Sequence, residues 1–292
     1  MLFRNDLPGN TSFVTLVRLF DALHLSHARS LMWAMRVVAP ADQQTVDRLI
    51  ANRSFFFFPN TGRSGSKWLA KLLGKSTNAV VAHEPVPGEA SAYLETYREP
   101  GAADAYFRQF RKRFIYFLLN RRNERIYGET NGHLRRHIEA IKVHLSNPTL
   151  IHLVRHPMDA VTSAMNREVF LEAHPHQKPS VRCSIQLSDE EWRDMSRFQK
   201  ICWVWREDNE FIRTRVTSFV RMEDILGNYG YFQAKVLTPT GLDLREADWA
   251  QSIHEKVNVG ERGRFPEYGR WDKRDKADFE RICGPEMHNY GY

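Results

Sequence analysis

The sequence contains few cysteines: only Cys183, Cys202 and Cys283 occur among its 292 residues. They are too few and too scattered for a disulfide framework or a zinc site, which favours a reducing compartment. No run of roughly 18 apolar residues occurs, so we expect no transmembrane helix. The first residues are interrupted by Arg4 and Asp6 and lack the apolar core of a signal peptide. These absences predict a soluble, cytoplasmic protein.

Repeats, low-complexity tracts and convincing linkers are also absent, which favours one globular unit over an array of domains. What is present is a globular composition, with 42% hydrophobic and 12% aromatic residues. Such a chain has enough apolar surface to build a core, so disorder is excluded as its main state. Lys and Arg number 42 against 35 Asp and Glu. This basic balance favours anionic partners, such as phosphate, sulfate, nucleic acid or acidic lipid.

Strands and helices alternate along most of the chain. Short apolar runs bounded by polar residues predict strands over 55–58, 80–81, 126–127, 150–154 and 218–220. The spacing of apolar residues predicts helices over 67–73, 103–120, 134–145, 158–169 and 190–213. The four phenylalanines at 55–58 are typical of a strand that is buried on both faces. The alternation predicts an α/β fold of three layers, with helices on both faces of a central, mainly parallel sheet.

The first 50 residues are a predicted helical extension. Apolar residues recur at helical spacing over 11–38, and 42–52 has the pattern of another short helix. We expect these helices to pack on the surface of the α/β domain, which spans residues 51–292. A dimer contact or a membrane-surface helix is the alternative for this extension.

The segment after the first predicted strand has the composition of an anion-binding loop. Residues 62–68 read Gly-Arg-Ser-Gly-Ser-Lys-Trp and lead into a predicted helix. Glycines let the backbone turn tightly, and the free N–H groups of a first helical turn point at a bound anion. Ser64 and Ser66 add hydroxyl donors, while Arg63 and Lys67 add positive charge. The pattern predicts a P-loop-like phosphate site, against the alternative of an ordinary turn with basic decoration.

The loop does not have the spacing of a Walker A motif. That motif reads G-x-x-x-x-G-K-[S/T], whereas only two residues separate Gly62 from Gly65. Trp68 follows Lys67 where the motif has its magnesium-binding hydroxyl, and no convincing acidic strand end follows downstream. The spacing therefore fits a phosphate site better than a magnesium–ATP site.

A second basic position follows the strand predicted over 150–154. Arg155 stands at the end of that strand, and Pro157 opens the next predicted helix. This places the guanidinium at the carboxyl edge of the sheet, where open α/β sheets bind ligands. Ser163 lies on the same face of that helix as Asp159. Arg155 and Ser163 could therefore both contact a second phosphate.

These two loops together resemble the phosphate-binding motifs of the sulfotransferase superfamily, in its bacterial and carbohydrate-type branch rather than the cytosolic phenol-type branch. The resemblance implies that 3′-phosphoadenosine 5′-phosphosulfate (PAPS) is the donor and that adenosine 3′,5′-bisphosphate is the product. It implies that residues 62–68 hold the 5′-phosphosulfate. It implies that Arg155 and Ser163 hold the 3′-phosphate.

Other segments carry the same resemblance, which covers most of the chain from Phe55 onward. Residues 219–225 resemble the family's strand followed by Glu-Asp-Leu, and Trp271 with residues 287–292 resembles its C-terminal pattern. Residues 260–264 stand where the family has a loop over the donor. The resemblance thus implies further donor-binding residues, namely Arg262, Gly263 and Arg264.

Sulfuryl transfer depends on charge stabilisation and in-line positioning, by analogy with phosphoryl transfer. Arg63, Lys67 and Ser66 are the candidates to stabilise the leaving group. The cytosolic branch has lysine and threonine where Arg63 and Lys67 stand, so the cation that contacts the transferred group stays open. We expect no metal, because the sequence has no clustered metal ligands.

The reaction also needs a general base for the acceptor hydroxyl. Glu84 follows a predicted strand in a His-Glu-Pro context, and the resemblance implies that this glutamate is the base. Its neighbour His83 should face the opposite way, because side chains alternate along a strand. Glu129 and His133 are the second choice, for the base or for binding the acceptor. The residues between them could instead cap the next helix.

The acceptor itself stays open among sugar, peptide, lipid and small alcohol. Phenylalanines recur at helical spacing through the basic segment 98–125, which favours a core-facing stripe; a basic helix that binds an acidic acceptor or membrane surface is the alternative. Residues 170–187 lack periodicity and are either an acceptor loop or a plain surface excursion. No nucleic-acid-binding signature occurs. Peripheral membrane contact and the oligomeric state stay open.

The sequence therefore predicts a PAPS-dependent sulfotransferase that transfers a sulfuryl group to a hydroxyl or amine. A nucleotide-dependent, kinase-like phosphotransferase is the alternative, because it would share the phosphate-binding loop.

Overall fold

The structure is a computed structural model that describes residue 35 and residues 39–174, 176–255 and 265–292. The helices predicted over 11–38 lie outside these residues except for Met35, which is buried. The loop at 260–264 also lies outside them.

The strands that the structure describes run parallel, as predicted. They are β1 (Ser54–Pro59), β2 (Ala79–His83), β3 (Ile126–Asn131), β4 (Thr149–Leu150), β5 (His152–Val154) and β6 (Phe219–Arg221). One sheet has the order β2-β3-β1-β4, and β5 pairs with β6. Between β4 and β5, the amide of Ile151 donates to the carbonyl of Phe57 at 3.1 Å. The continuous segment 149–154 therefore pairs with β1 through its first residues and with β6 through its last, and so joins the two sheets.

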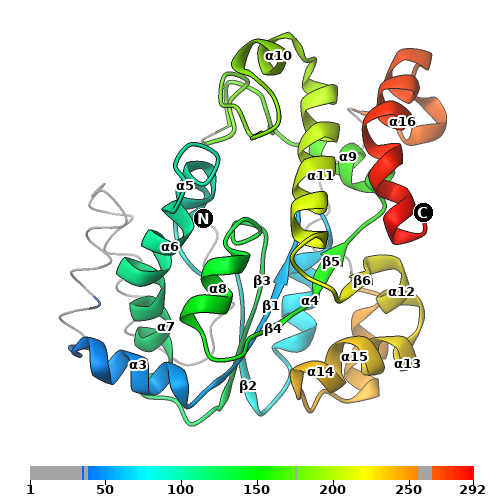
Figure 1. The fold of residues 1–292 in the computed structure, drawn as a ribbon. Coiled ribbons are helices and arrows are strands. Elements are labelled where there is room, and N and C mark those ends of the chain that lie inside the picture. The colour runs from blue at the N-terminus through cyan, green and yellow to red at the C-terminus, as the bar shows by residue number, and fades with distance from the viewer. Residues whose placement is uncertain (1–34, 36–38, 175, 256–264) are drawn as a thin grey trace.

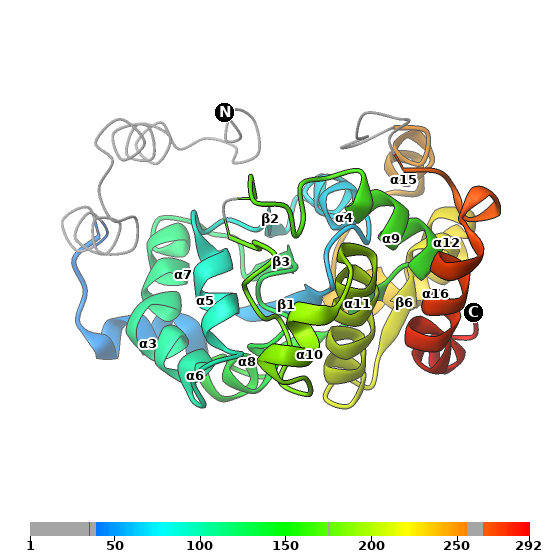
Figure 2. The same cartoon turned by 90° about the horizontal axis from the view of Figure 1, so that it is seen from above.

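The phenylalanines of β1 divide the core between the two faces of the sheet. Phe55 and Phe57 pack in a cluster with side chains of α3, α7 and α8, whereas Phe56 and Phe58 pack with α4 and the helices after β6. The ring of Phe56 lies over Gly128 of β3, where a Cβ atom would come within 1.9 Å of it. Helices therefore cover both faces (Figures 1 and 2), and the predicted three-layer α/β fold is confirmed.

The α-helices in the described ranges are α3 (Gln43–Ala51), α4 (Ser66–Leu73), α5 (Glu89–Glu95), α6 (Ala102–Tyr106), α7 (Lys112–Leu119), α8 (Ile138–His144), α9 (Pro157–Met165), α10 (Asp189–Asp194), α11 (Arg197–Arg213), α12 (Met222–Gly227), α13 (Tyr229–Phe232), α14 (Thr238–Thr240), α15 (Glu246–Ser252) and α16 (Lys273–Met287). Single turns of π or 3-10 geometry are η1 (Phe107–Arg111), η2 (Gln233–Leu237), η3 (Tyr268–Arg270) and η4 (His288–Tyr290).

Two predicted helices have different boundaries in the structure. The helix predicted over 190–213 is two helices, α10 and α11, and each begins with a capping box, at Ser188 and at Ser196. The helix predicted from residue 134 begins only at Ile138, because residues 132–137 form turns that place polar side chains near the carboxyl ends of the strands.

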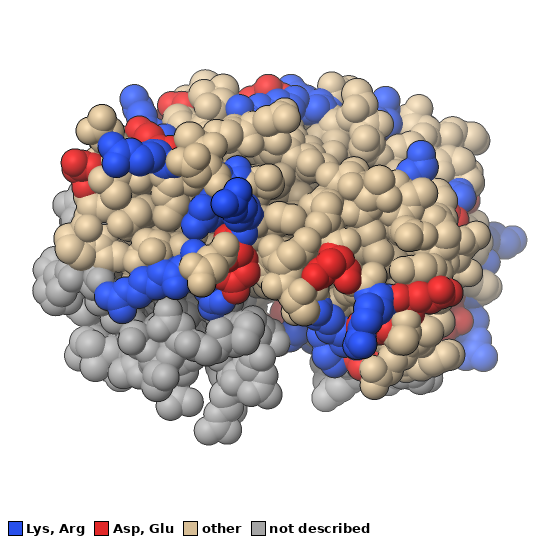
Figure 3. Space-filling view, turned by 90° about the horizontal axis from the view of Figure 1, so that it is seen from below, with Lys and Arg blue, Asp and Glu red and all other residues tan. Residues whose placement is uncertain are grey.

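The basic segment of α6, η1 and α7 faces the core with its phenylalanine stripe, as favoured from the sequence. Phe107, Phe110, Phe114 and Phe117 are all buried. On the underside of the molecule, Lys and Arg side chains lie interspersed with Asp and Glu (Figure 3). None of the described helices is long and apolar enough to cross a membrane. Cys183, Cys202 and Cys283 are buried free thiols.

Candidate active site

The loop after β1 has a left-handed backbone at Gly62, Arg63 and Gly65, where φ is +79°, +56° and +82°. The side-chain oxygen of Asn60 accepts from the Gly62 amide at 3.0 Å and fixes the first turn. Gly65 precedes α4, and no side chain caps this helix. A Cβ atom at Gly65 would lie 2.6 Å from the Met222 side chain. The loop therefore presents uncapped helix amides, and only glycine fits at its last position.

The polar side chains of this loop differ in whether they are free to bind an anion. The Ser64 hydroxyl is buried and donates to the Gly62 carbonyl at 3.1 Å, so it supports the loop itself. The Ser66 hydroxyl lies 3.1 Å from Nε2 of His83. Lys67 is half-buried in the first turn of α4, and no hydrogen bond or ion pair to another described residue occupies it. Lys67 is therefore available to an anion.

The side chain of Trp68, a residue predicted to bind the donor, points away from the loop, while its backbone amide belongs to the uncapped first turn of α4. Its side chain is buried among the apolar residues beside α4, and its Nε1 donates to the Ser252 carbonyl at 2.8 Å. The amphipathic pattern of α4 turns this position toward the core. The side chain of Trp68 thus stabilises the helix that carries the loop rather than facing a ligand.

The second loop lies against the first. Nε of Arg63 donates to Oγ of Ser163 at 2.9 Å, and Arg155 donates to the Arg63 carbonyl at 3.2 Å. Arg155, which precedes α9, also pairs at 3.1 Å with Asp159 in the first turn of that helix. Arg155 and Ser163, which the sequence predicted to contact a second phosphate, therefore lie against the first loop, residues 62–68.

The segment at 219–225 fixes the second loop from the other side. The carboxylate of Glu223 accepts from the His156 amide at 3.0 Å and from the Tyr292 hydroxyl at 2.9 Å. Arg221 and Asp224 form an ion pair with N–O distances of 2.7 and 3.0 Å. The segment therefore holds the second loop and the C-terminus in place. Its charged side chains all have partners within the protein.

Positive charge is concentrated where the two loops meet. Burial, together with the nearby Arg167 and Arg155, lowers the pKa of the Arg63 guanidinium to about 10, while Glu84 opposes them. Like charges that repel one another at a half-buried site are stabilised by a bound anion. Arg167 was not singled out from the sequence, where nothing distinguished it from other basic residues.

Glu84 lies just past β2 with a left-handed backbone, φ +43°. Its Oε1 accepts from the Gly132 amide at 3.2 Å. Burial tends to raise the pKa of Glu84, but His133, His83, the Gly132 amide and Arg135 together hold that pKa below its usual value of 4.5. The carboxylate, which is 29% exposed, is therefore ionised at neutral pH and open to a ligand.

His83 does not face away from Glu84, contrary to the expectation from strand alternation. Its Nδ1 lies 3.9 Å from the carboxylate of Glu84, and its Nε2 faces the Ser66 hydroxyl. The strand ends at His83, and the left-handed backbone of Glu84 turns the carboxylate back toward the same side. The alternation rule therefore fails at this position because it holds only within a strand.

Glu129 is enclosed in the protein interior. It is fully buried, it pairs with Arg111, and it accepts from Tyr127 at 2.5 Å and from Asn131 at 2.9 Å. Arg111 also lies 3.2 Å from the buried carboxylate of Glu89. Burial raises the pKa of Glu129, although Arg111 opposes this. Glu129 is therefore part of a structural network, and its carboxylate has no access to an acceptor.

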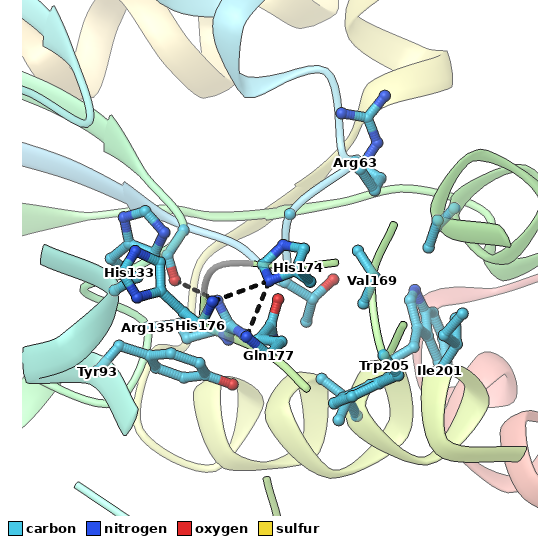
Figure 4. A pocket seen from close by; sticks show the side chains of 18 of the residues that line it. Arg63, Tyr93, His133, Arg135, Val169, His174, His176, Gln177, Ile201 and Trp205 are labelled. Carbon is cyan, nitrogen blue, oxygen red and sulfur yellow. Dashed lines mark hydrogen bonds between the residues drawn. The ribbon is translucent and has the colours of Figure 1, made fainter. Parts of the chain in front are cut away.

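A cavity of about 350 Å³ opens beside these groups. Arg63, Glu84 and His133 contribute to its lining, as do α5, α9, α11 and the segment 169–177. Figure 4 shows His133 and Tyr93 on one side of it and Ile201 and Trp205 on the other. Segment 170–187, predicted to be an acceptor loop or a surface excursion, thus lines the cavity with its first residues.

A buried network that the sequence did not reveal supports the cavity. Arg135 donates to Asp208 and to the Gly132 carbonyl, both at 2.6 Å, and stacks on the Tyr93 ring at 3.6 Å. The amide of Gly132 donates to Glu84 and its carbonyl accepts from Arg135, so this one residue connects the network to the candidate base. Charged residues are usually exposed, so their burial here had no signal in the sequence.

The donor-binding residues predicted over 262–264 fall outside the described ranges. Arg262, Gly263 and Arg264 lie within residues 256–264, for which no structure is described. Among the described residues, no group of three or more His, Cys, Asp or Glu side chains is arranged to hold a metal ion.

Comparisons with known proteins relate the chain to solved structures only. No protein-family model and no curated protein matches the sequence. The sulfotransferase domain from the curacin biosynthetic pathway is similar over 70% of this chain and 78% of its own, with 14% identity and a TM-score of 0.46. A sulfotransferase from Alicyclobacillus acidocaldarius is similar over 80% of this chain and 96% of its own, with 14% identity and a TM-score of 0.42.

Proposed function

We propose that this protein is a sulfotransferase that moves the sulfuryl group of PAPS to a hydroxyl or amine of an acceptor. The observation that carries this proposal is the contact of Arg63 with both Ser163 and Arg155. It joins two basic loops, which follow different strands, into one site for a ligand with two separate anionic groups. PAPS is such a ligand, with a phosphosulfate at one end of its ribose and a 3′-phosphate at the other.

The residues of the two loops fit these anions. At the phosphosulfate, Arg63, Lys67 and the uncapped amides of α4 supply positive charge and N–H donors. At the 3′-phosphate, Arg155 still has free N–H groups, because a guanidinium carries five N–H bonds. Ser163 accepts from Arg63, so its own O–H is free to donate. Bound PAPS supplies a sulfuryl group on a good leaving group.

The protein's own groups account for the transfer to the acceptor. As the acceptor oxygen bonds to sulfur, the bond from sulfur to the bridging phosphate oxygen breaks. Arg63 and Lys67 stabilise the charge that develops on that phosphate. The ionised Glu84 takes the proton from the acceptor, and His133, which lines the same cavity, is the second choice for this role.

Calorimetric binding of adenosine 3′,5′-bisphosphate tests the donor site. We expect magnesium-independent binding that ATP does not match. Arg155→Ala should weaken binding of the bisphosphate about 10- to 100-fold, the effect of losing hydrogen bonds to a charged group, and leave adenosine 5′-monophosphate binding unchanged. Arg245→Ala is the matched control, because this arginine is 79% exposed and pairs only locally with Asp248.

Two results would contradict the proposed donor. Binding of ATP that requires magnesium would favour the kinase-like alternative. Equal losses of bisphosphate and monophosphate affinity in Arg155→Ala would show that Arg155 does not bind the 3′-phosphate.

The base is tested separately by Glu84→Gln. The amide keeps the shape of the side chain but cannot take a proton, so turnover should fall by about 10²–10⁴-fold, with unchanged binding of the bisphosphate. Near-normal turnover of this variant would exclude Glu84 and leave His133.

A further inference from the structure

The charged groups of the cavity that are free to bind a ligand lie at one end. Arg63, Glu84 and His133 come from the loops at the carboxyl ends of the strands. Figure 4 shows His133 on the side of the cavity opposite to Ile201. If Glu84 is the base, the reacting hydroxyl lies at the charged end and the rest of the acceptor extends toward α9 and α11.

The other charged residues in the lining are already neutralised. Glu89 faces Arg111 at 3.2 Å and accepts from Asn131 at 2.8 Å. Arg135 is bound by Asp208 and by a backbone carbonyl. Both side chains are buried, so breaking these contacts would leave a charge without a partner. They are therefore not available to bind a charged group of an acceptor.

The far wall of the cavity is apolar. Ala160 and Ala164, one helical turn apart on α9, and Ile201 and Val204 on α11 all line it and are all buried. The alanines provide space, because larger residues there would fill the gap between the two helices. A hydroxyl or charge placed against these four side chains would lose its water and gain no hydrogen bond from them, which is unfavourable. Trp205 lies on the same side of the cavity, and its buried Nε1 has no hydrogen-bond partner among the described residues, so this indole N–H is a donor that an acceptor oxygen could use.

His174, His176 and Gln177, in segment 170–177, add polar side chains to the lining of the cavity. Nδ1 of His174 accepts from the amides of His176 and Gln177, at 3.2 and 2.8 Å, so this ring nitrogen is used within the segment. The volume of about 350 Å³ is near the lower end of the roughly 300–1,000 Å³ typical of small-molecule pockets. The cavity is therefore of a size for a small molecule.

We propose, on the basis of the function proposed above, that the acceptor is a small, uncharged alcohol with a mainly apolar body. Its hydroxyl reaches Glu84, and its body packs between α9 and α11 against Ala160, Ala164 and Val204. Transfer joins the alcohol oxygen to sulfur, passes its proton to Glu84 and releases adenosine 3′,5′-bisphosphate. Of the acceptor classes that the sequence left open, this selects the small alcohol over sugars and charged peptides.

Alcohols that share one ring test this proposal. The panel is 4-propylcyclohexanol, cyclohexanol, myo-inositol and 4-hydroxycyclohexanecarboxylate, with PAPS as donor and release of the bisphosphate as readout. We expect kcat/KM for 4-propylcyclohexanol to exceed that for cyclohexanol by about tenfold, as apolar contacts in a pocket give. We expect myo-inositol and the carboxylate to be at least about 100-fold poorer than 4-propylcyclohexanol, because their polar groups would be left unpaired.

Substitutions in the apolar wall test whether the preference for an apolar alcohol arises there. Ala164→Leu should reduce kcat/KM for 4-propylcyclohexanol at least about tenfold, as loss of pocket volume does, while bisphosphate binding is kept. Ala140→Leu is the matched control, since this alanine is equally buried in a helix but packs with α3 and α7 away from the cavity. If Ala164→Leu does not fold, Val204→Ala replaces it and should improve turnover of alcohols bulkier than the propyl compound.

The outcomes separate this inference from the function it rests on. Bisphosphate binding together with a preference for myo-inositol or the carboxylate would overturn the inference alone. Equal turnover of all four compounds, or an Ala164→Leu variant indistinguishable from Ala140→Leu, would also overturn it. Absence of bisphosphate binding in the unaltered protein would overturn the proposed function, and the inference with it.

Discussion

Glu84 is ionised because of its neighbours rather than because of solvent exposure. Burial tends to raise the pKa of Glu84, but His133, the first of several opposing groups, and His83, Gly132 and Arg135 hold it below 4.5. If Glu84 is the base, as proposed above, activity is lost as the pH falls through this pKa, because a base is active only when deprotonated. Its lowered pKa then extends activity to more acidic pH, at the cost of a weaker base at neutral pH.

We predict that His133→Gln shifts the acidic limb of the kcat/KM profile to higher pH. Removing the His133 side chain removes the group that lowers the pKa of Glu84 most. Turnover near pH 7 should change less than about tenfold, because Glu84 stays ionised there. The measurement is kcat/KM against pH, with circular dichroism to confirm folding at each point. An unchanged acidic limb, or a loss at pH 7 as large as at pH 4, would assign His133 another role.

Gly132 positions Glu84 through its backbone. The amide donates to Glu84 at 3.2 Å, and a Cβ atom at residue 132 would lie 3.1 Å from the same carboxylate oxygen. We predict that Gly132→Ala lowers kcat by at least about tenfold, because a small misplacement of a catalytic group is costly. Bisphosphate binding should be kept. Gly227→Ala is the control, since nothing lies within 4 Å of a Cβ atom there; equal kcat in the two variants would remove Gly132 from this role.

At the scale of elements, one buried carboxylate connects α5, α11 and the turns before α8. Asp208 accepts from Arg135 at 2.6 Å, from Arg136 at 2.7 Å, and from Tyr93 and Tyr97 at 2.9 and 2.8 Å. Burial tends to raise the pKa of Asp208, but the two guanidiniums lower it. The network fixes the helices that form one side of the cavity.

We predict that Asp208→Asn destabilises the protein by about 3–5 kcal/mol, because it leaves the buried guanidinium of Arg135 without its anion and leaves Arg136 with Glu207 alone. The measurement is the free energy of unfolding from urea denaturation. Asp189→Asn is the control: it breaks the ion pair with Arg182, but its side chain is 79% exposed, so the midpoint should hardly move. If Asp208→Asn is insoluble, Tyr97→Phe should still cost about 1 kcal/mol. Equal midpoints for the two Asp variants would contradict the prediction.

The strands of the sheet were predicted from the sequence, whereas the boundaries of α10 and α11 and the helices after β6 were not. The phenylalanine run predicted β1 because a strand buried on both faces needs no polar positions. The helix at 190–213 appeared continuous because both halves have apolar residues at helical spacing, although Ser188 and Ser196 already had the pattern of helix caps. Of the helices after β6, α12 to α15 are short and have no strong period, whereas the 15-residue α16 buries Phe279, Ile282, Cys283 and Met287 at helical spacing, a signal that was present in the sequence.

For the whole molecule, the parallel sheet explains why the donor loops were predictable. Parallel strands place their carboxyl ends at one edge, so loops about 100 residues apart in sequence were expected to meet, and Arg63 contacts Ser163. The cavity depends instead on the packing of α5, α9 and α11, which are joined by no local pattern. Its wall along α9 and α11 includes alanine, valine and isoleucine, which in the sequence are indistinguishable from core residues.

The same geometry predicts how ligand binding is distributed over the molecule. We predict that adenosine 3′,5′-bisphosphate slows hydrogen exchange in residues 61–69 and 155–165 together, because it binds both loops. Adenosine 5′-monophosphate should protect mainly the first segment, since it lacks the phosphate that Arg155 and Ser163 would hold. Helices α3 and α7, on the opposite face of the sheet from α4, should exchange as in the free protein. Hydrogen exchange with mass spectrometry measures all of these segments in one experiment. Protection of only one loop by the bisphosphate would show that the two loops are adjacent but do not share a ligand.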